Sequence, residues 1–144
     1  MPFAITIDRH TEYVKFQLCG PASMSNFVEL VQTAETETLF WSDRNALFDL
    51  REVQGDLSAD EQVFLGELVG RNLAHLDRLA SVMQAPRITR RSEGTAQQMG
   101  VQLRVFSSEP EATQWLMDGY AESAPVALQQ EEGLRRLLDG RDVG

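Results

Sequence analysis

The sequence predicts an α/β fold, a sandwich of helices around a mixed, mostly parallel sheet of about five strands with four helices. Two observations predict it. First, the chain opens with two alternating apolar segments joined by a polar turn, which is typical of a β-hairpin. Second, three short apolar runs come later, each succeeded by a helical pattern. Because strands separated by helices become parallel neighbours, only the first strand is expected to be antiparallel to its partner.

The first predicted elements are the hairpin and a helix. Residues 3–8 and 13–18 alternate between apolar and polar side chains, which predicts two strands. A Gly-Pro pair ends the hairpin, and Ser23 or Ser25 can cap the next helix. The helix itself is predicted by apolar residues at i, i+3, i+4 and i+7 spacing: Phe27, Leu30, Val31 and Ala34.

Three strand–helix units complete the predicted domain. Buried strands are expected from the apolar runs at residues 46–50, 79–83 and 101–106. Helices are expected at residues 58–74, at about 89–99, and from 108 onward. Ser58 with Glu61, and Ser108 with Glu111, form capping-box patterns at two of the helix starts. Gly100 is placed to end the third helix in a left-handed conformation.

The domain is predicted to cover residues 3–117, succeeded by a linker and an amphipathic tail over residues 118–144. In the tail, Leu134, Leu137 and Leu138 are spaced for one face of a helix. The tail either docks on the domain or binds a partner, and the sequence leaves both interpretations open.

Composition excludes several classes of function. The chain has 144 residues, a formal net charge of −9 and a single cysteine. Such an acidic chain is not expected to bind nucleic acid or to insert stably into a membrane. Cys19 alone can form neither an intramolecular disulfide nor a cysteine-based metal cage. Since no apolar run approaches the roughly 18 residues of a membrane span and no signal peptide is visible, a soluble cytoplasmic protein is expected.

Acidic and hydroxyl side chains come after the third predicted strand, where ligand and regulatory groups gather in α/β folds. They are Asp49, Glu52, Asp56 and Ser58. Asp49 is similar in place to the phospho-accepting aspartate of receiver domains. That chemistry also needs carboxylates for Mg²⁺ after the first strand and a lysine after the last, whereas the only lysine here is Lys15. We therefore interpret Asp49 as a turn former and Ser58 as a helix cap.

The remaining chemistry-bearing residues form no recognisable site. His10 and His75 lack a third metal ligand at a recognisable spacing, and His75 is expected to cap the end of its helix. Cys19 has apolar neighbours, among which a thiol is usually inert. No nucleophile elbow, phosphate loop or dinucleotide-binding pattern occurs. The sequence predicts no catalytic residue, metal or cofactor, and the chain is expected not to be an enzyme.

The second predicted helix has apolar residues over about half of its circumference, more than the roughly 100° stripe of a surface helix. Gly66 and Gly70 each cost about 1 kcal/mol relative to alanine, so some other interaction should compensate. One interpretation is close packing on the sheet or on a neighbouring helix. The other is that Phe64, Gly66, Leu68 and Gly70 face a partner or an apolar ligand. Residues 39–41, Leu-Phe-Trp, form a second apolar patch.

Several segments carry a family resemblance: residues 15–20, 46–50, 78–82, 100–106, 111–112 and 115–116. On these segments the chain resembles the STAS superfamily, the sulphate transporter and anti-sigma-factor antagonist domains. It is most similar to the bacterial branch called sporulation-stage-II-protein-AA-like, or SpoIIAA-like. The resemblance covers about residues 3–117 and implies a STAS-like sandwich with a regulatory role.

Two features of this resemblance bear on function. Anti-sigma-factor antagonists carry an Asp-Ser-Ser/Thr-Gly-type sequence after the third strand, and a partner kinase phosphorylates its serine. Residues 51–58 lack that motif, and the residue after Ser58 is Ala59, so the phosphorylation switch is not carried over. The branch also resembles the lipid-binding Sec14-like fold, which implies an apolar pocket beneath the helices that begin after Ser58 and Thr89.

Two functional hypotheses result. The leading one is a regulatory domain that binds a protein partner, or its own copy, through the helix at residues 58–74. The alternative is a Sec14-like carrier of a small apolar or lipid-like molecule. Its pocket would be lined by Phe64, Leu68, Met83 and Met99.

Overall fold

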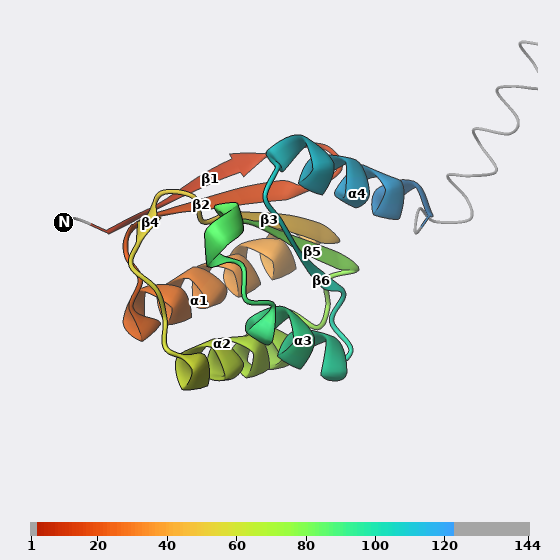
Figure 1. Cartoon of the computed structure of the whole chain (residues 1–144). Coiled ribbons are helices and arrows are strands. Elements are labelled where there is room, and N and C mark those ends of the chain that lie inside the picture. The colour runs from red at the N-terminus through yellow and green to blue at the C-terminus, as the bar shows by residue number, and fades with distance from the viewer. Residues whose placement is uncertain (1–2, 123–144) are drawn as a thin grey trace, which may run out of the picture.

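Residues 3–122 are described by the computed structural model of the chain (Figure 1). In chain order the elements are β1 (Ala4–Arg9), β2 (Val14–Pro21), α1 (Met24–Trp41), β3 (Asn45–Asp49), β4 (Val53–Gln54), α2 (Ala59–Asn72), β5 (Arg78–Val82), the short 3-10 helix η1 (Ala85–Arg87), α3 (Arg91–Gln98), β6 (Leu103–Phe106) and α4 (Glu109–Glu122). The expected α/β class with a mixed sheet and four α-helices is confirmed.

The sheet has the order β1-β2-β3-β5-β6. β1 and β2 form the expected antiparallel hairpin, with Ile7 opposite Phe16, and the other neighbours pair in parallel. The sequence did not predict β4, a two-residue strand in which Val53 and Gln54 pair with Gly20 and Pro21 at the end of β2. After the polar turn that ends β3, the chain therefore continues beside β2 in the same direction as β3.

Two hydrophobic clusters of unequal size hold the layers together. The larger cluster lies between the sheet and the helices α1, α2 and α3, and includes Phe16, Leu30, Phe48 and Leu79. The smaller one packs α4 on the opposite face through Leu47, Ala80, Val82, Ala112 and Leu116. Figure 1 shows this division, with three helices on one side of the sheet and α4 on the other.

The helix ends agree with the capping residues in the sequence. The hydroxyl of Ser23 accepts a hydrogen bond from the backbone N–H of Asn26 at 3.2 Å, so it is the cap of α1. At α2, Ser58 and Glu61 satisfy each other's backbone N–H groups as a capping box should. Gly100 comes after α3 with a φ of +94°, the left-handed conformation that glycine adopts without strain.

The expected domain end at residue 117 lies inside α4. This helix continues to Glu122, so residues 118–122 are helical rather than linker. Gly119 is buried here because the side chain of Arg78 lies against it, and a Cβ at this glycine would clash with Arg78 Cδ. The predicted tail helix around Leu134, Leu137 and Leu138 lies outside the described residues. Among residues 3–122, no helix is long and apolar enough to cross a membrane.

Candidate functional site

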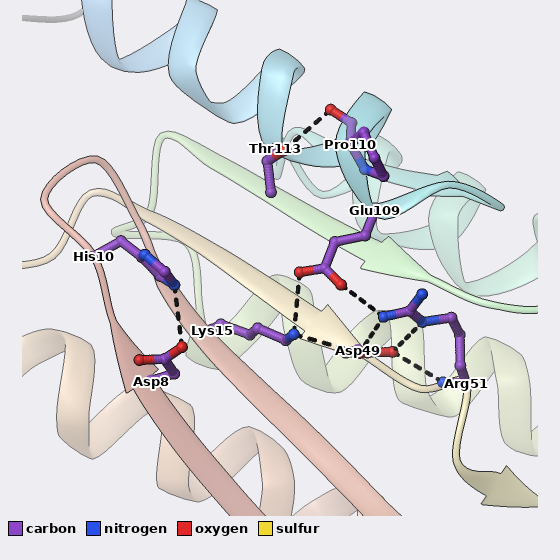
Figure 2. Close-up of polar contacts among 8 residues, drawn as sticks. All are labelled: Asp8, His10, Lys15, Asp49, Arg51, Glu109, Pro110 and Thr113. Carbon is purple, nitrogen blue, oxygen red and sulfur yellow. Dashed lines mark hydrogen bonds and ion pairs between the residues drawn. The ribbon is translucent and has the colours of Figure 1, made fainter.

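Four charged side chains from different parts of the chain meet on the α4 face of the sheet (Figure 2). They are Lys15 of β2, Asp49 at the end of β3, Arg51 in the turn after it, and Glu109 at the start of α4. We call these four residues the charge cluster. The β2–β3 register explains why two of them share a face, because Lys15 pairs with Leu47 and side chains two residues apart point the same way.

Each cation of the charge cluster contacts both carboxylates. Arg51 donates from Nε to Asp49 Oδ1 at 2.9 Å and from Nη2 to Asp49 Oδ2 at 2.8 Å. The same Nη2 donates to Glu109 Oε1 at 2.6 Å. Lys15 Nζ donates to Glu109 Oε2 at 3.0 Å and lies 3.6 Å from Asp49 Oδ2. Two positive and two negative groups thus neutralise one another.

The surroundings of Asp49 keep its carboxylate ionised. Its side chain is 1% exposed, and burial alone would raise its pKa. Hydrogen bonds from the Arg51 side chain and backbone, with the charges of Arg51 and Lys15, outweigh burial and hold the pKa of Asp49 below its usual range. Burial opposes the charge on Lys15 too, but Glu109 and Asp49 raise the pKa of Lys15 above its ordinary value.

This geometry favours a structural clamp over a catalytic centre. A carboxylate with a lowered pKa does not hold a proton near neutral pH and is a poor general acid. The oxygens of Asp49 already accept two hydrogen bonds from the Arg51 side chain and one from the backbone N–H of Arg51 at 3.2 Å. Glu109 also lies at the helix N-terminus, where a negative charge is stabilised. The charge cluster joins β2, β3 and α4.

The other residues predicted at this strand end do not enter the charge cluster. Glu52 is exposed in the turn after β3. Asp56 is exposed as well and forms an ion pair with Arg87 at 3.2 Å. Ser58 caps α2 as expected. Asp49 does form the expected turn contact with Arg51. Lys15 and Glu109 were missed because only the strand register and the placement of α4 bring them to this strand end. The Arg51 side chain was missed although it lies only two residues from Asp49.

The two glycines of α2 lie against α3 rather than facing outward. A Cβ at Gly66 would come within 2.6 Å of the backbone oxygen of Ser92, and one at Gly70 within 2.6 Å of Met99 Sδ. Close packing on a neighbouring helix therefore accounts for both glycines. The hypothesis that they face a partner or a ligand does not hold at these two positions, because a helix of the same chain covers them.

The other two residues predicted to face a partner, Phe64 and Leu68, differ in exposure. Phe64 is 45% exposed and its neighbour Val63 is 40% exposed, so α2 presents an apolar surface near its start. Leu68 is half-buried against the large core cluster. On α1, Phe40 and Trp41 are the most exposed large apolar side chains among residues 3–122.

A small apolar cavity of about 80 Å³ lies beneath α1, α2 and α3. Met83 lines it as expected, but Phe64, Leu68 and Met99 do not. Phe64 is exposed on α2, Leu68 packs against the large core cluster, and Met99 lies against Gly70 of α2. Arg87 is one of its lining residues and donates to the carbonyl oxygens of Val53, at 2.6 Å, and of Gly55.

The histidines have structural partners. His75 Nε2 lies 2.7 Å from Thr38 Oγ1, which ties the end of α2 to α1, so the expectation that His75 caps its own helix is wrong. His10 stacks on Tyr13 with the ring centres 4.5 Å apart. Its Nε2 lies 3.3 Å from Asp8 Oδ2, a contact that Figure 2 shows. In residues 3–122 no group of three or more His, Cys, Asp or Glu side chains is placed to hold a metal ion.

Comparison with known proteins identifies which known fold the structure resembles. No family model and no curated protein matches the sequence. The structure is similar to an uncharacterized DUF3478-family protein with a SpoIIAA-like fold from Shewanella loihica, with 23% identity and a TM-score of 0.51, over 79% of this chain and 93% of that one. It is also similar to an anti-sigma factor antagonist from Mycobacterium paratuberculosis, with 14% identity and a TM-score of 0.57, over 80% of this chain and 94% of that one.

These similarities define the class as an α/β protein with a SpoIIAA-like fold. The particular arrangement in this chain is a SpoIIAA-like sandwich in which the end of β3 carries the charge cluster. The fold predicted from the core segments is thereby confirmed.

Proposed function

We propose that this chain is a regulatory domain of STAS type, without catalytic activity of its own, that binds a protein partner in the cytoplasm. The binding surface is the outer side of α2 near its start. The observation that carries the proposal is the exposure of Val63 and Phe64, at 40% and 45%, on the helix that follows β4. Adjacent exposed apolar side chains, aromatic ones above all, are typical of the centre of a protein interface.

The surroundings of this surface support binding that is not governed by phosphorylation at Ser58. The Ser58 hydroxyl accepts from the backbone N–H of Glu61 at 3.2 Å as part of the helix cap. The residue after it is Ala59, unlike the motif of phosphorylated antagonists. Asp49, the other candidate for a switch in this region, is held in the charge cluster.

Substitution of Phe64 tests the proposal. Phe64→Glu places a charge at the centre of the proposed surface and should weaken partner binding at least tenfold, about the effect of losing a residue that dominates an interface. Ala74→Glu, which adds the same charge at an exposed position beyond the end of α2, is the matched control. The measurement is quantitative affinity capture from the native cell with the full chain as bait.

The expected result is a partner that the wild type and the Ala74→Glu variant retain and the Phe64→Glu variant loses. If every specifically captured protein binds the Phe64→Glu variant as well as the wild type, the proposed surface is wrong. Unchanged folding of both variants is checked by circular dichroism.

The cavity favours a second candidate function, the carriage of a small apolar molecule. At about 80 Å³ it is smaller than the roughly 150 Å³ engineered cavity that admits benzene. A larger ligand would therefore need the lining residues to move apart. Native mass spectrometry of gently purified protein distinguishes this function, because a bound molecule adds mass to the chain and a clean mass speaks against it.

A further inference from the structure

The two edges of the sheet differ in how their backbone groups are satisfied. At the β6 edge, the N–H and C=O groups that point away from β5 have partners in and around α3. Gln97 Nε2 donates to the Leu103 oxygen at 2.8 Å, and the Val105 N–H donates to Glu93 Oε2 at 2.6 Å. Arg90 Nη1 lies 3.4 Å from the Val105 oxygen.

These contacts form a row of side chains that takes the place of a further strand. Arg90, Glu93 and Gln97 have the i, i+3, i+7 spacing of one helix face, and Glu93 is only 8% exposed. Because the outward groups of β6 are already paired, this edge is closed to an incoming strand.

The opposite edge is open. Within the described residues, β1 has a neighbour on its β2 side only. The backbone N–H of His10 donates to the Tyr13 oxygen at 2.9 Å, and hydrogen-bonded pairs alternate along an antiparallel hairpin. This alternation places the backbone N–H and C=O groups of Ile5, Ile7 and Arg9 on the outer edge. β1 contains no proline, and Ile7 is 39% exposed, so neither a proline nor a charge at this central position blocks the edge.

We propose that a second copy of this chain pairs with β1, giving a two-fold dimer with a continuous sheet through both molecules. In this pairing, residues whose backbone N–H and C=O groups point outward lie opposite one another. The two-fold axis therefore passes through the strand pair at Thr6 or at Ile7. The Thr6-centred register places Ile5 opposite the partner's Ile7, Thr6 opposite the partner's Thr6, and Asp8 opposite the partner's Ala4. Apolar residues then meet apolar ones and no like charges oppose each other. This proposal does not depend on the α2 surface.

The same register places the backbone of the partner's Phe3 opposite Arg9, whose guanidinium lies 5.1 Å from the ring centre of Trp41.

The closed β6 edge explains why such an assembly stops at two copies. A β1–β1 pairing is isologous and uses the open edge of both molecules, so that only the two sealed β6 edges remain. The structure therefore points to a discrete dimer and not to a growing fibre.

Sedimentation of the full chain tests the proposal with three substitutions at one position. Ile7→Pro removes an outward-facing N–H and no hairpin hydrogen bond, and Ile7→Lys puts a charge on the edge, so both should reduce the sedimenting mass from dimer to monomer. Ile7→Val keeps the N–H and an apolar side chain, and should remain a dimer. Because each copy has a net charge of −9, the wild-type dimer should also tighten as salt increases.

Hydrogen exchange adds a second measurement that does not depend on the proline variant folding well. In the wild type the amides of Ile5, Ile7 and Arg9 should exchange slowly, and in the Ile7→Lys monomer the amides at these positions should exchange quickly. A monomeric wild type, or a dimer that survives both Ile7→Pro and Ile7→Lys, would overturn the proposal. Phe64→Glu should leave the dimer intact, so failure of the α2 surface and failure of the β1 edge are distinguishable.

Discussion

At the scale of single residues, Asp49 connects the sequence to the layer structure. It ends β3, forms a turn contact with the Arg51 backbone, and brings Arg51, Lys15 and Glu109 together across β2, β3 and α4. The sequence indicated only the turn contact, since it depends on residues two apart. The Asp49–Arg51 ion pair is equally local. The contacts of Lys15 and Glu109 depend on the strand register and on where α4 begins, which local patterns do not reveal.

Removal of the Asp49 charge should destabilise the fold in a pH-dependent way. Asp49→Asn keeps the shape of the side chain but weakens the hydrogen bonds from Arg51, so the free energy of unfolding near neutral pH should fall by roughly 1–3 kcal/mol. We expect a loss in the lower part of this range, because the Arg51 side chain is 40% exposed and water screens its interaction with Asp49.

The sign of the pH effect is set by the lowered pKa of Asp49. The stability that the ionised Asp49 carboxylate gives the fold is fully present above the unfolded-state pKa of about 4. It is lost as the pH falls through the lower pKa of the folded state. The difference between wild type and Asp49→Asn should therefore shrink as the pH drops below about 4. Urea unfolding across acidic and neutral pH measures it, and a difference independent of pH would contradict the role given to this carboxylate.

At the scale of elements, the packing of α2 on α3 explains why α2 contains Gly66 and Gly70, although glycine is unfavourable inside a helix. Gly66 meets backbone and Thr95 atoms of the α3 region, whereas Gly70 meets the flexible side chain of Met99. The sequence suggested that something compensates for these glycines. Which neighbour does so was not visible, because the close approach involves a segment far away in the chain.

Substitution of glycine by alanine should have opposite effects on the two helices. In Gly66→Ala the gain in helix propensity, about 1 kcal/mol, is outweighed by overpacking against the Ser92 backbone, which typically costs about 1–3 kcal/mol. Gly94→Ala in α3 is the matched control, since no atom lies within 4 Å of its added Cβ. Urea unfolding should show the first variant destabilised and the second stabilised by up to about 1 kcal/mol. Stabilisation of both would contradict the close contact between α2 and α3.

At the scale of the whole molecule, the fold was largely predictable and the functional surfaces were less so. Hairpin alternation, buried strand runs and capping boxes indicated the layers and the direction of each strand. The short β4 escaped prediction because two residues carry no periodicity. The sealed β6 edge, the open β1 edge and the position of the cavity depend on how distant elements meet, so only the structure reveals them.

We propose that this molecule works through contacts with other protein chains rather than as a carrier of a small molecule. Native mass spectrometry of the full chain, purified gently from its own cells, distinguishes these two functions. We expect assemblies of protein chains, either the dimer or a complex with another protein, whose masses are explained by the chains alone. A monomer that retains a small apolar molecule at one copy per chain would contradict it.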